Sequence, residues 1–353
     1  MALDRHGFTA AFAAMALGLG MVACDRSPSS DLVAPRIEKG KGGGGSSGGS
    51  IAFSGDATAV QATVLGTSTT LSHAGPLPGP GGAEEAALLQ ASIPGTLTAQ
   101  VLHAATIGQG DRSRSEASTV NLNLTAGGNT IAAGFLMARA EAVCAGSDAR
   151  ASGSSEIVGL TLNGQSISVS GQPNQTILLP AGAGKIVLNE QTSAPGSITV
   201  TALHIVVTGV AEVGVSSAHA DIVCRGPAQC DANRDFVTGG GWISLPSGAK
   251  GTFGVAGGIK NGLWGHLTYI DHGAGGPHVK GTGVTAYVVV DDTTRRVEGT
   301  AEVDGRAGFT YAVVVSDHGE PGRDDTFSLQ LSNGYQASGS LAGGNIQLHR
   351  PCR

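Results

Sequence analysis

The sequence predicts an all-β protein with two β-sandwich-like domains, which follow an export signal and a flexible linker. Glycine contributes 57 of the 353 residues, whereas aromatic residues make up 4% and charged residues 14% of the chain. Glycine-rich turns between runs of β-branched residues are typical of all-β proteins. Apolar residues make up 41% of the chain, which is enough to build buried cores.

The first 23 residues have the pattern of a lipoprotein signal peptide. Residues 8–22 carry no charge, and as a helix they would reach only about 22 Å, less than the roughly 30 Å core of a bilayer. Met21-Val22-Ala23-Cys24 resembles the bacterial lipobox. We therefore predict lipidation at Cys24 and an extracytoplasmic protein anchored to the cell envelope or surface. Plain secretion after cleavage near Ala23 is the alternative.

Residues 24–50 are predicted to form a flexible tether, because every residue from 40 to 50 except Lys41 is Gly or Ser. The first folded domain is expected at 51–225, and a linker at 226–234 separates it from a second domain at 235–353.

Several patterns predict strands and turns in the first domain. Val120, Leu122 and Leu124 alternate with polar residues and are expected to share one face. Asn163-Gly164 is a preferred dipeptide for a two-residue hairpin turn, which would pair Leu160 with Ile167 and Val158 with Val169. Residues 198–209 are expected to form a central strand, and residues 84–90 could add a short helical turn.

The second domain contains eight candidate strands, which together suggest a β-sandwich or jelly roll. They are expected at 236–245, 251–255, 263–271, 279–290, 297–303, 308–315, 326–331 and 345–349.

Short motifs in both domains carry a family resemblance. In the first they are Leu160-Thr161-Leu162-Asn163-Gly164, Ile186-Val187-Leu188-Asn189-Glu190-Gln191 and Ala202-Leu203-His204-Ile205, with Cys144 and Cys224. They resemble the choice-of-anchor P domain of bacterial surface proteins. Val237-Thr238-Gly239-Gly240-Gly241-Trp242-Ile243 and Leu341-Ala342-Gly343-Gly344-Asn345-Ile346 resemble the small β-domain that often follows it. The resemblance implies an extracellular protein and brings no known activity or catalytic residue.

The four cysteines after Cys24 are expected to form two disulfides, because the inferred compartment is oxidising. Ala140-Glu141-Ala142-Val143-Cys144 resembles Ala220-Asp221-Ile222-Val223-Cys224, so each cysteine should end a strand on the same kind of face. We predict a Cys144–Cys224 bond and a Cys230–Cys352 bond that ties the ends of the second domain. The alternative joins Cys224 to Cys230 and Cys144 to Cys352.

Two groups of residues are candidate metal ligands. The acidic turn with Asp317, Glu320, Asp324 and Asp325 could hold Ca²⁺, although a solvated acidic turn explains the same residues. A second group lies within thirteen residues and could ligate zinc, or could form a polar strand end. Its members are His266, Asp271, His272 and His278.

The sequence offers no catalytic constellation, since it has no G-x-S-x-G motif and no spacing that selects a triad. The net charge of −6 and the lack of a Lys/Arg cluster make nucleic acid an unexpected partner. We expect a lipid-anchored, non-catalytic envelope protein with a structural or adhesive role, whose partner is an envelope or extracellular glycan or protein. A carbohydrate-binding accessory module is the first alternative, and an unrecognised extracellular hydrolase the second.

Overall fold

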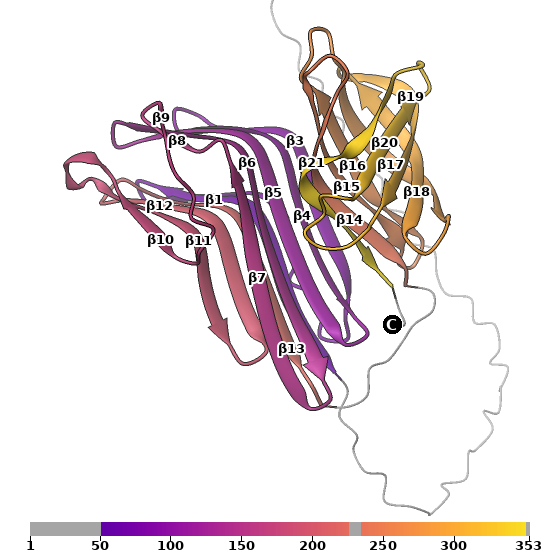
Figure 1. Ribbon diagram of the computed structural model, residues 1–353, viewed down its shortest axis with the longest axis horizontal. Coiled ribbons are helices and arrows are strands. Elements are labelled where there is room, and N and C mark those ends of the chain that lie inside the picture. The colour runs from indigo at the N-terminus through magenta and orange to yellow at the C-terminus, as the bar shows by residue number, and fades with distance from the viewer. Residues whose placement is uncertain (1–50, 226–233, 351–353) are drawn as a thin grey trace, which may run out of the picture. The chain divides into compact units, whose positions relative to one another are not determined.

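The computed structural model describes residues 51–225 and 234–350, which form two all-β lobes (Figure 1). Apart from one 3-10 turn, η1 at Pro180–Gly182, the regular elements of these residues are antiparallel strands. No helix among the described residues is both long and apolar enough to cross a membrane. The predicted all-β class is confirmed.

The first lobe is a sandwich of two sheets. Sheet A has the order β10-β11-β12-β13-β1-β2, and its central strands β1, β12 and β13 pack against β4, β5 and β6 of sheet B. The bounds in sheet A are β1 (Ala52–Val64), β2 (Thr67–Ala74), β10 (Gln175–Leu178), β11 (Gly184–Ala194), β12 (Ser197–Val207) and β13 (Ala211–Val223).

Sheet B has the order β3-β4-β5-β6-β8-β9, and β7 pairs with the other end of β6. Its bounds are β3 (Gly82–Ile93), β4 (Leu97–Gln109), β5 (Arg112–Ala126), β6 (Asn129–Ala145), β7 (Asp148–Val158), β8 (Thr161–Leu162) and β9 (Gln165–Ser166). The helical turn expected at 84–90 is wrong, because these residues belong to β3 and pair with β4.

Two local predictions for the first lobe are confirmed. The strand expected at 198–209 is β12, which lies between β11 and β13. The Asn163-Gly164 turn joins β8 to β9, with Leu162 opposite Gln165 and a hydrogen bond from the Ile167 N–H to the Leu160 carbonyl. Val158, expected to continue this hairpin, pairs instead with Phe135 of β6.

The alternation expected for Val120, Leu122 and Leu124 is wrong at Val120. Leu122 and Leu124 lie in the core between the sheets, whereas Val120 belongs to a separate apolar cluster with Phe135 and Trp242. The reason is an irregularity in the strand: Asn121 has a φ of 47°, and Val101 on the neighbouring strand has a φ of 44°. Such bulges reverse which side chains face inward beyond them.

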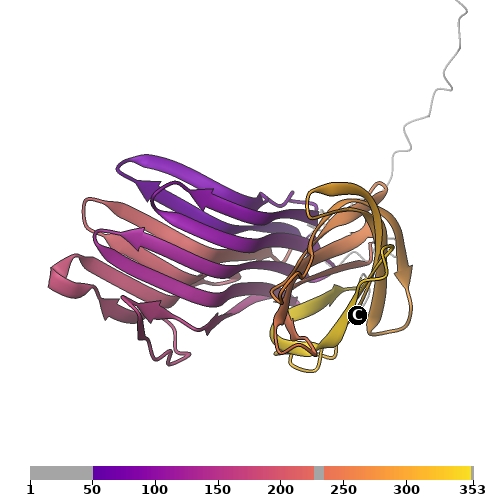
Figure 2. The ribbon, with the colours of Figure 1, turned by 90° about the horizontal axis from the view of Figure 1, so that it is seen from above.

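The second lobe is a closed barrel, whose ring of strands is visible in Figure 2. The expected count of eight strands is confirmed, but the expected sandwich or jelly roll is wrong, because the first strand pairs with the last. The strands are β14 (Phe236–Ser244), β15 (Lys250–Ile259), β16 (Leu263–Asp271), β17 (His278–Val289), β18 (Thr294–Val303), β19 (Arg306–Ser316), β20 (Thr326–Leu331) and β21 (Gln336–His349).

Aromatic rings stack inside the barrel among Val, Leu and Ile side chains. Phe253 and Phe327 stack with ring centroids 4.0 Å apart, and Tyr269 lies 6.0 Å from Phe327 on a nearly parallel plane. The sandwich core contains one aromatic residue, Phe53, and is otherwise built mainly from Ala, Val, Leu and Ile. Most of the few aromatic residues of the chain therefore lie in the second lobe, where large side chains fill a narrow barrel.

The barrel packs against part of the outer face of sheet B, which we call the covered half. Trp242 of the barrel meets Phe135 of β6 edge to face, with ring centroids 4.9 Å apart. Glycine permits the close approach, since a Cβ on Gly240 would lie 2.5 Å from the Ser118 Oγ, and one on Gly254 would lie 3.0 Å from the His103 Cβ. Gly240 of β14 and Gly254 of β15 thus serve contact between the lobes, whereas Gly239 and Gly241 face β21 of the barrel.

Candidate functional site

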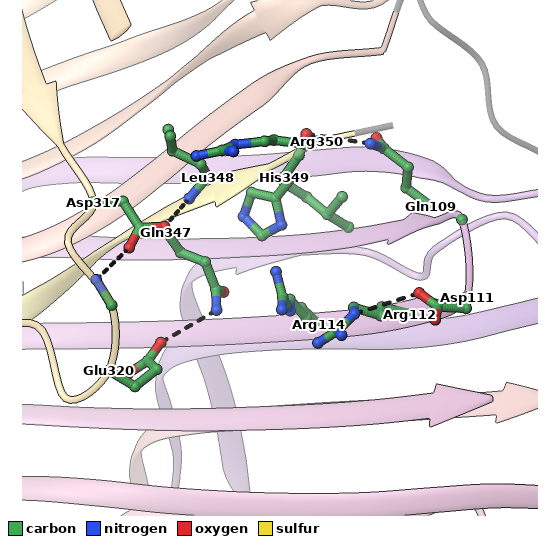
Figure 3. Close-up of a pocket in the computed structure, with 13 residues that line it drawn as sticks. Gln109, Asp111, Arg112, Arg114, Asp317, Glu320, Gln347, Leu348, His349 and Arg350 are labelled. Atoms are coloured by element: carbon green, nitrogen blue, oxygen red, sulfur yellow. Dashed lines mark hydrogen bonds and ion pairs between the residues drawn. The ribbon is translucent and has the colours of Figure 1, made fainter. Parts of the chain in front are cut away.

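A polar pocket of about 360 Å³ lies where the two lobes meet (Figure 3). The turn between β4 and β5 and the start of β5 form one side of it. The end of β21 and the loop before β20 form the other. Three arginines and three carboxylates line it: Arg112, Arg114, Arg350, Asp111, Asp317 and Glu320.

Two of the pocket carboxylates are held by donors of the barrel. Asp317 accepts hydrogen bonds from the backbone N–H of Gly319 and of Leu348, each 2.9 Å long. Glu320 accepts from Asn345 Nδ2 at 3.1 Å and lies 3.3 Å from the Arg139 guanidinium of the sandwich. Burial raises the pKa of Glu320, and Arg139 offsets part of this effect.

The cationic side of the pocket is less completely paired. The Nη2 of Arg114 lies 3.5 Å from a Glu141 oxygen, and its buried Nε has no hydrogen-bond partner among the described residues. The pocket also contains His349, whose pKa is lowered well below its usual value by burial and by the charge of Arg114. His349 is therefore neutral, and its Nε2 pairs with Thr238 Oγ1 at 2.9 Å.

A chain of four titratable side chains crosses the covered half, and we call it the buried network. Glu116 lies 3.1 Å from His103 Nε2, His103 Nδ1 lies 3.0 Å from His266 Nε2, and His266 Nδ1 contacts Glu85. His266 comes from the barrel and the other three from sheet B, so the network joins the lobes.

Hydrogen-bond logic assigns protons along the buried network. An ionised carboxylate can only accept, so an ionised Glu116 takes the hydrogen of His103 Nε2 and leaves His103 Nδ1 to accept from His266 Nε2. Burial lowers the pKa of His103, which agrees with a neutral ring. Burial alone would raise the pKa of Glu85, but the charge and hydrogen bond of His266 lower it overall. His103 and Glu116 are buried, so this part of the network serves contact between the lobes.

The rest of the outer face of sheet B is open and contains a groove. Two adjoining hollows of about 800 and 420 Å³ share one row of side chains that lie directly opposite each other on five strands. Ser92 pairs with Thr98, Thr98 with Asn123, Asn123 with Ala132, and Ala132 with Thr161. At about 4.8 Å per strand, this row is about 19 Å long. We call it the neutral row, since none of its side chains ionises.

A second line of amides lies beside the neutral row. Gln90 pairs with Gln100, and Asn121 donates a 2.9 Å hydrogen bond to the Gln100 side chain. Ala132 and Gly134 of β6 also line this hollow, and their small size leaves space beside the amides. The residues that line the groove therefore offer amide and hydroxyl groups, which both donate and accept hydrogen bonds, and no charged side chain, while the Lys250 Nζ lies 4.0 Å from the position that a Cβ on Gly134 would take.

The structure does not assemble the predicted calcium site. No group of three or more potential ligands that could hold a metal occurs among the described residues. Asp325 is buried and accepts from the N–H of His318 and of Ile346, and burial raises its pKa to about 6 despite these bonds. Asp317 and Glu320 belong to the pocket, and Asp324 is exposed. Asp317, Glu320 and Asp325 connect the loop to β21 instead of converging on one point.

The histidines considered for zinc are also separate. His266 belongs to the buried network, and His272 pairs through Nε2 with Thr252 Oγ1 at 2.9 Å. Asp271 accepts from the Tyr335 hydroxyl at 2.8 Å, while His278 lies 3.4 Å from the Gln90 amide.

Of the predicted cysteine roles, one lies within the described residues. Cys144 and Cys224 form a disulfide with a Cα–Cα distance of 5.6 Å, which confirms that pairing. It joins the ends of β6 and β13, which face each other from the two sheets. Cys24, Cys230 and Cys352 lie outside the described residues, so the lipid anchor and the Cys230–Cys352 bond stay predictions.

Comparison of the chain with protein-family models, with curated proteins and with solved structures gives no match.

Proposed function

We propose that this protein is a lipid-anchored, non-catalytic adhesive protein of the cell envelope, and that the neutral row binds an uncharged glycan. The observation that carries the proposal is the alignment of Ser92, Thr98, Asn123 and Thr161 across neighbouring strands. Such a row presents hydroxyl and amide groups at a regular spacing along an open groove.

The chemistry of the groove favours a sugar chain over a peptide. Peptides commonly bind by adding a strand to a free sheet edge, by placing apolar side chains in a groove, or by pairing charges. The middle of the neutral row lies on the interior strands β4, β5 and β6, whose edges are already paired. Uncharged sugar hydroxyls match the mixed donors and acceptors of Asn123 and Thr98.

The sequence supplies the proposed attachment. Lipidation at Cys24 would hold the chain on a membrane, and the tether at 24–50 would let the groove reach a glycan some distance away. The resemblance to choice-of-anchor P proteins agrees with a surface role, and we propose membership of that family on the motifs quoted above.

Binding is tested on an array of neutral and charged polysaccharides with the full chain in detergent. We expect a neutral polysaccharide to bind. The double variant Thr98→Ala/Asn123→Ala should bind it about tenfold more weakly, since each lost hydrogen bond contributes about 0.5–1.5 kcal/mol.

The matched control removes one amide and one hydroxyl from sheet A. Gln61 and Thr192 are exposed there and line none of the described hollows, so Gln61→Ala/Thr192→Ala should bind normally. Equal loss of binding in both double variants, or binding of acidic polysaccharides alone, would contradict the proposed role of the row.

The anchor is tested by cell fractionation. Cys24→Ala should move the protein from the membrane to the soluble fraction. A processed Cys24→Ala protein that still sediments with membranes would show that the anchor has been assigned wrongly.

A further inference from the structure

We infer that the groove of sheet B takes a straight, ribbon-like glycan, whose pyranose rings are joined 1,4 through equatorial oxygens as in a β-1,4-linked chain of glucose. The inference rests on the glycan binding proposed for the neutral row and names the class of chain that the row selects. Three parallel lines of uncharged polar side chains across the strands of sheet B carry it.

The neutral row is the middle line, and one hollow lies on each side of it. A line of amides follows the side nearer the barrel, whose His278 lies 3.4 Å from the Gln90 amide. A line of threonines follows the other side, where Thr125 pairs with Thr130 across β5 and β6. Neighbouring lines are two residues apart along each strand, which is about 7 Å. The amides are Gln90, Gln100 and Asn121, and the threonines are Thr96, Thr125 and Thr130.

The spacing along the lines suits an extended chain of sugars. Successive members of the neutral row lie on neighbouring strands, so they repeat about every 4.8 Å. A pyranose ring with equatorial 1,4 linkages advances its chain by close to this distance, so the row of about 19 Å matches about four rings. An axial linkage, as in α-1,4-linked glucose, turns the chain at every ring and takes it off a straight row.

The two outer lines match the two edges of such a ribbon. The hydroxyl groups of an equatorially linked chain lie near the plane of the rings and point outward along both edges. Amides on one side and threonine hydroxyls on the other can each donate to these groups and accept from them. In the middle line, the Ala132 methyl group offers a contact for the C–H groups of a ring between the polar Asn123 and Thr161.

The linkage is tested by isothermal titration of the full chain with tetrasaccharides. Cellotetraose and maltotetraose contain the same glucose units and differ only in the β-1,4 or α-1,4 linkage. Tetrasaccharides of β-1,4-linked mannose and xylose are measured beside them, because the three lines select the linkage and not the configuration of each hydroxyl. We expect at least one of the three β-1,4 tetrasaccharides to bind at least tenfold more tightly than maltotetraose.

Ser92, at the β3 end of the neutral row, gives a second readout. Ser92→Ala removes the hydroxyl that meets the terminal ring, so it should weaken binding of the preferred tetrasaccharide about fivefold. The corresponding trisaccharide can occupy the remaining strands and should lose less than twofold. The matched control, Thr192→Ala, removes an exposed hydroxyl from sheet A and should leave both affinities unchanged.

The outcomes separate the inference from the function on which it rests. Maltotetraose binding as tightly as every β-1,4 tetrasaccharide would overturn the ribbon-like chain and leave glycan binding by the row in place. Equal losses for the trisaccharide and the tetrasaccharide in Ser92→Ala would do the same, as would an array on which only α-linked polysaccharides bind. If no neutral glycan binds at all, the proposed function fails and the inference falls with it.

Discussion

The two halves of the outer face of sheet B differ although the same strands, β4, β5 and β6, run through both. In the covered half, Val101, Val120 and Phe135 are buried under the barrel beside the buried network. In the open half, Gln100 and Asn123 remain accessible and uncharged. The irregular residues Val101 and Asn121 lie at the boundary between the halves.

The two halves use their polar groups differently. The covered half contains ionisable groups that are buried and bonded to one another, which is how a buried charge becomes tolerable. The open half contains neutral groups with unused bonding capacity, which is what a polar ligand requires. Stability should therefore depend on the covered half and ligand binding on the open half, and the predictions below test this division.

The largest effect is expected from Trp242→Ala. The indole is 7% exposed and packs on Phe135, so its removal leaves a cavity between the lobes and should cost about 3–5 kcal/mol of unfolding free energy. Urea unfolding measures this loss. The glycan affinity of the folded variant should stay within twofold of the wild-type affinity. A fully folded variant that no longer binds the glycan would show that binding also depends on the covered half.

A smaller loss is expected from Glu116→Ala. The change removes the acceptor of His103 Nε2 and leaves a buried donor unpaired, which should cost about 2–3 kcal/mol. Glu116→Gln keeps an acceptor and should lose less. The control is Glu298→Ala, whose exposed pair with Arg296 should contribute less than about 1 kcal/mol. Equal losses of unfolding free energy for Glu116→Ala and Glu298→Ala would show that the buried network stabilises the protein no more than an exposed ion pair does.

The covered half should also make stability depend on pH. The pKa of His103 is lower in the folded protein than its ordinary value of 6.5, so the unfolded chain binds the proton more readily. Its contribution to stability is present above pH 6.5 and is lost as the pH falls toward the folded pKa. The melting temperature should decrease from pH 7.5 to 5.5, and by a smaller amount in His103→Gln. An identical decrease in both proteins would contradict this origin.

Local features of the fold were predictable from the sequence. The Asn163-Gly164 turn and its register depend on residues that are adjacent in the chain, and most barrel strands are separated by clear turns. The Cys144–Cys224 bond was predictable because the two strands that end in cysteine repeat one pattern.

The remaining features depend on contacts between distant residues. The barrel closes through pairing of β14 with β21, which are separated by the whole domain. Residues 84–90 favour a helix by composition, but pairing with β4 overrides that preference. The buried network combines Glu85, His103 and Glu116 with His266, and no short motif contains them. The neutral row likewise arises from the registers of five strands.

The smallest effect, and the sharpest contrast with the covered half, is expected for the pH dependence of glycan binding. Ser92, Thr98, Asn123 and Thr161 have no side chain that titrates between pH 5.5 and 8, so the affinity for a neutral glycan should change less than twofold over that range. Binding is measured on the folded protein well below its melting temperature, so that the loss of stability from His103 does not enter. A tenfold change with a midpoint near pH 6.5 would mean that a histidine contacts the glycan. One candidate is His278, which lies 3.4 Å from the Gln90 amide, and His278→Gln would then abolish the pH dependence.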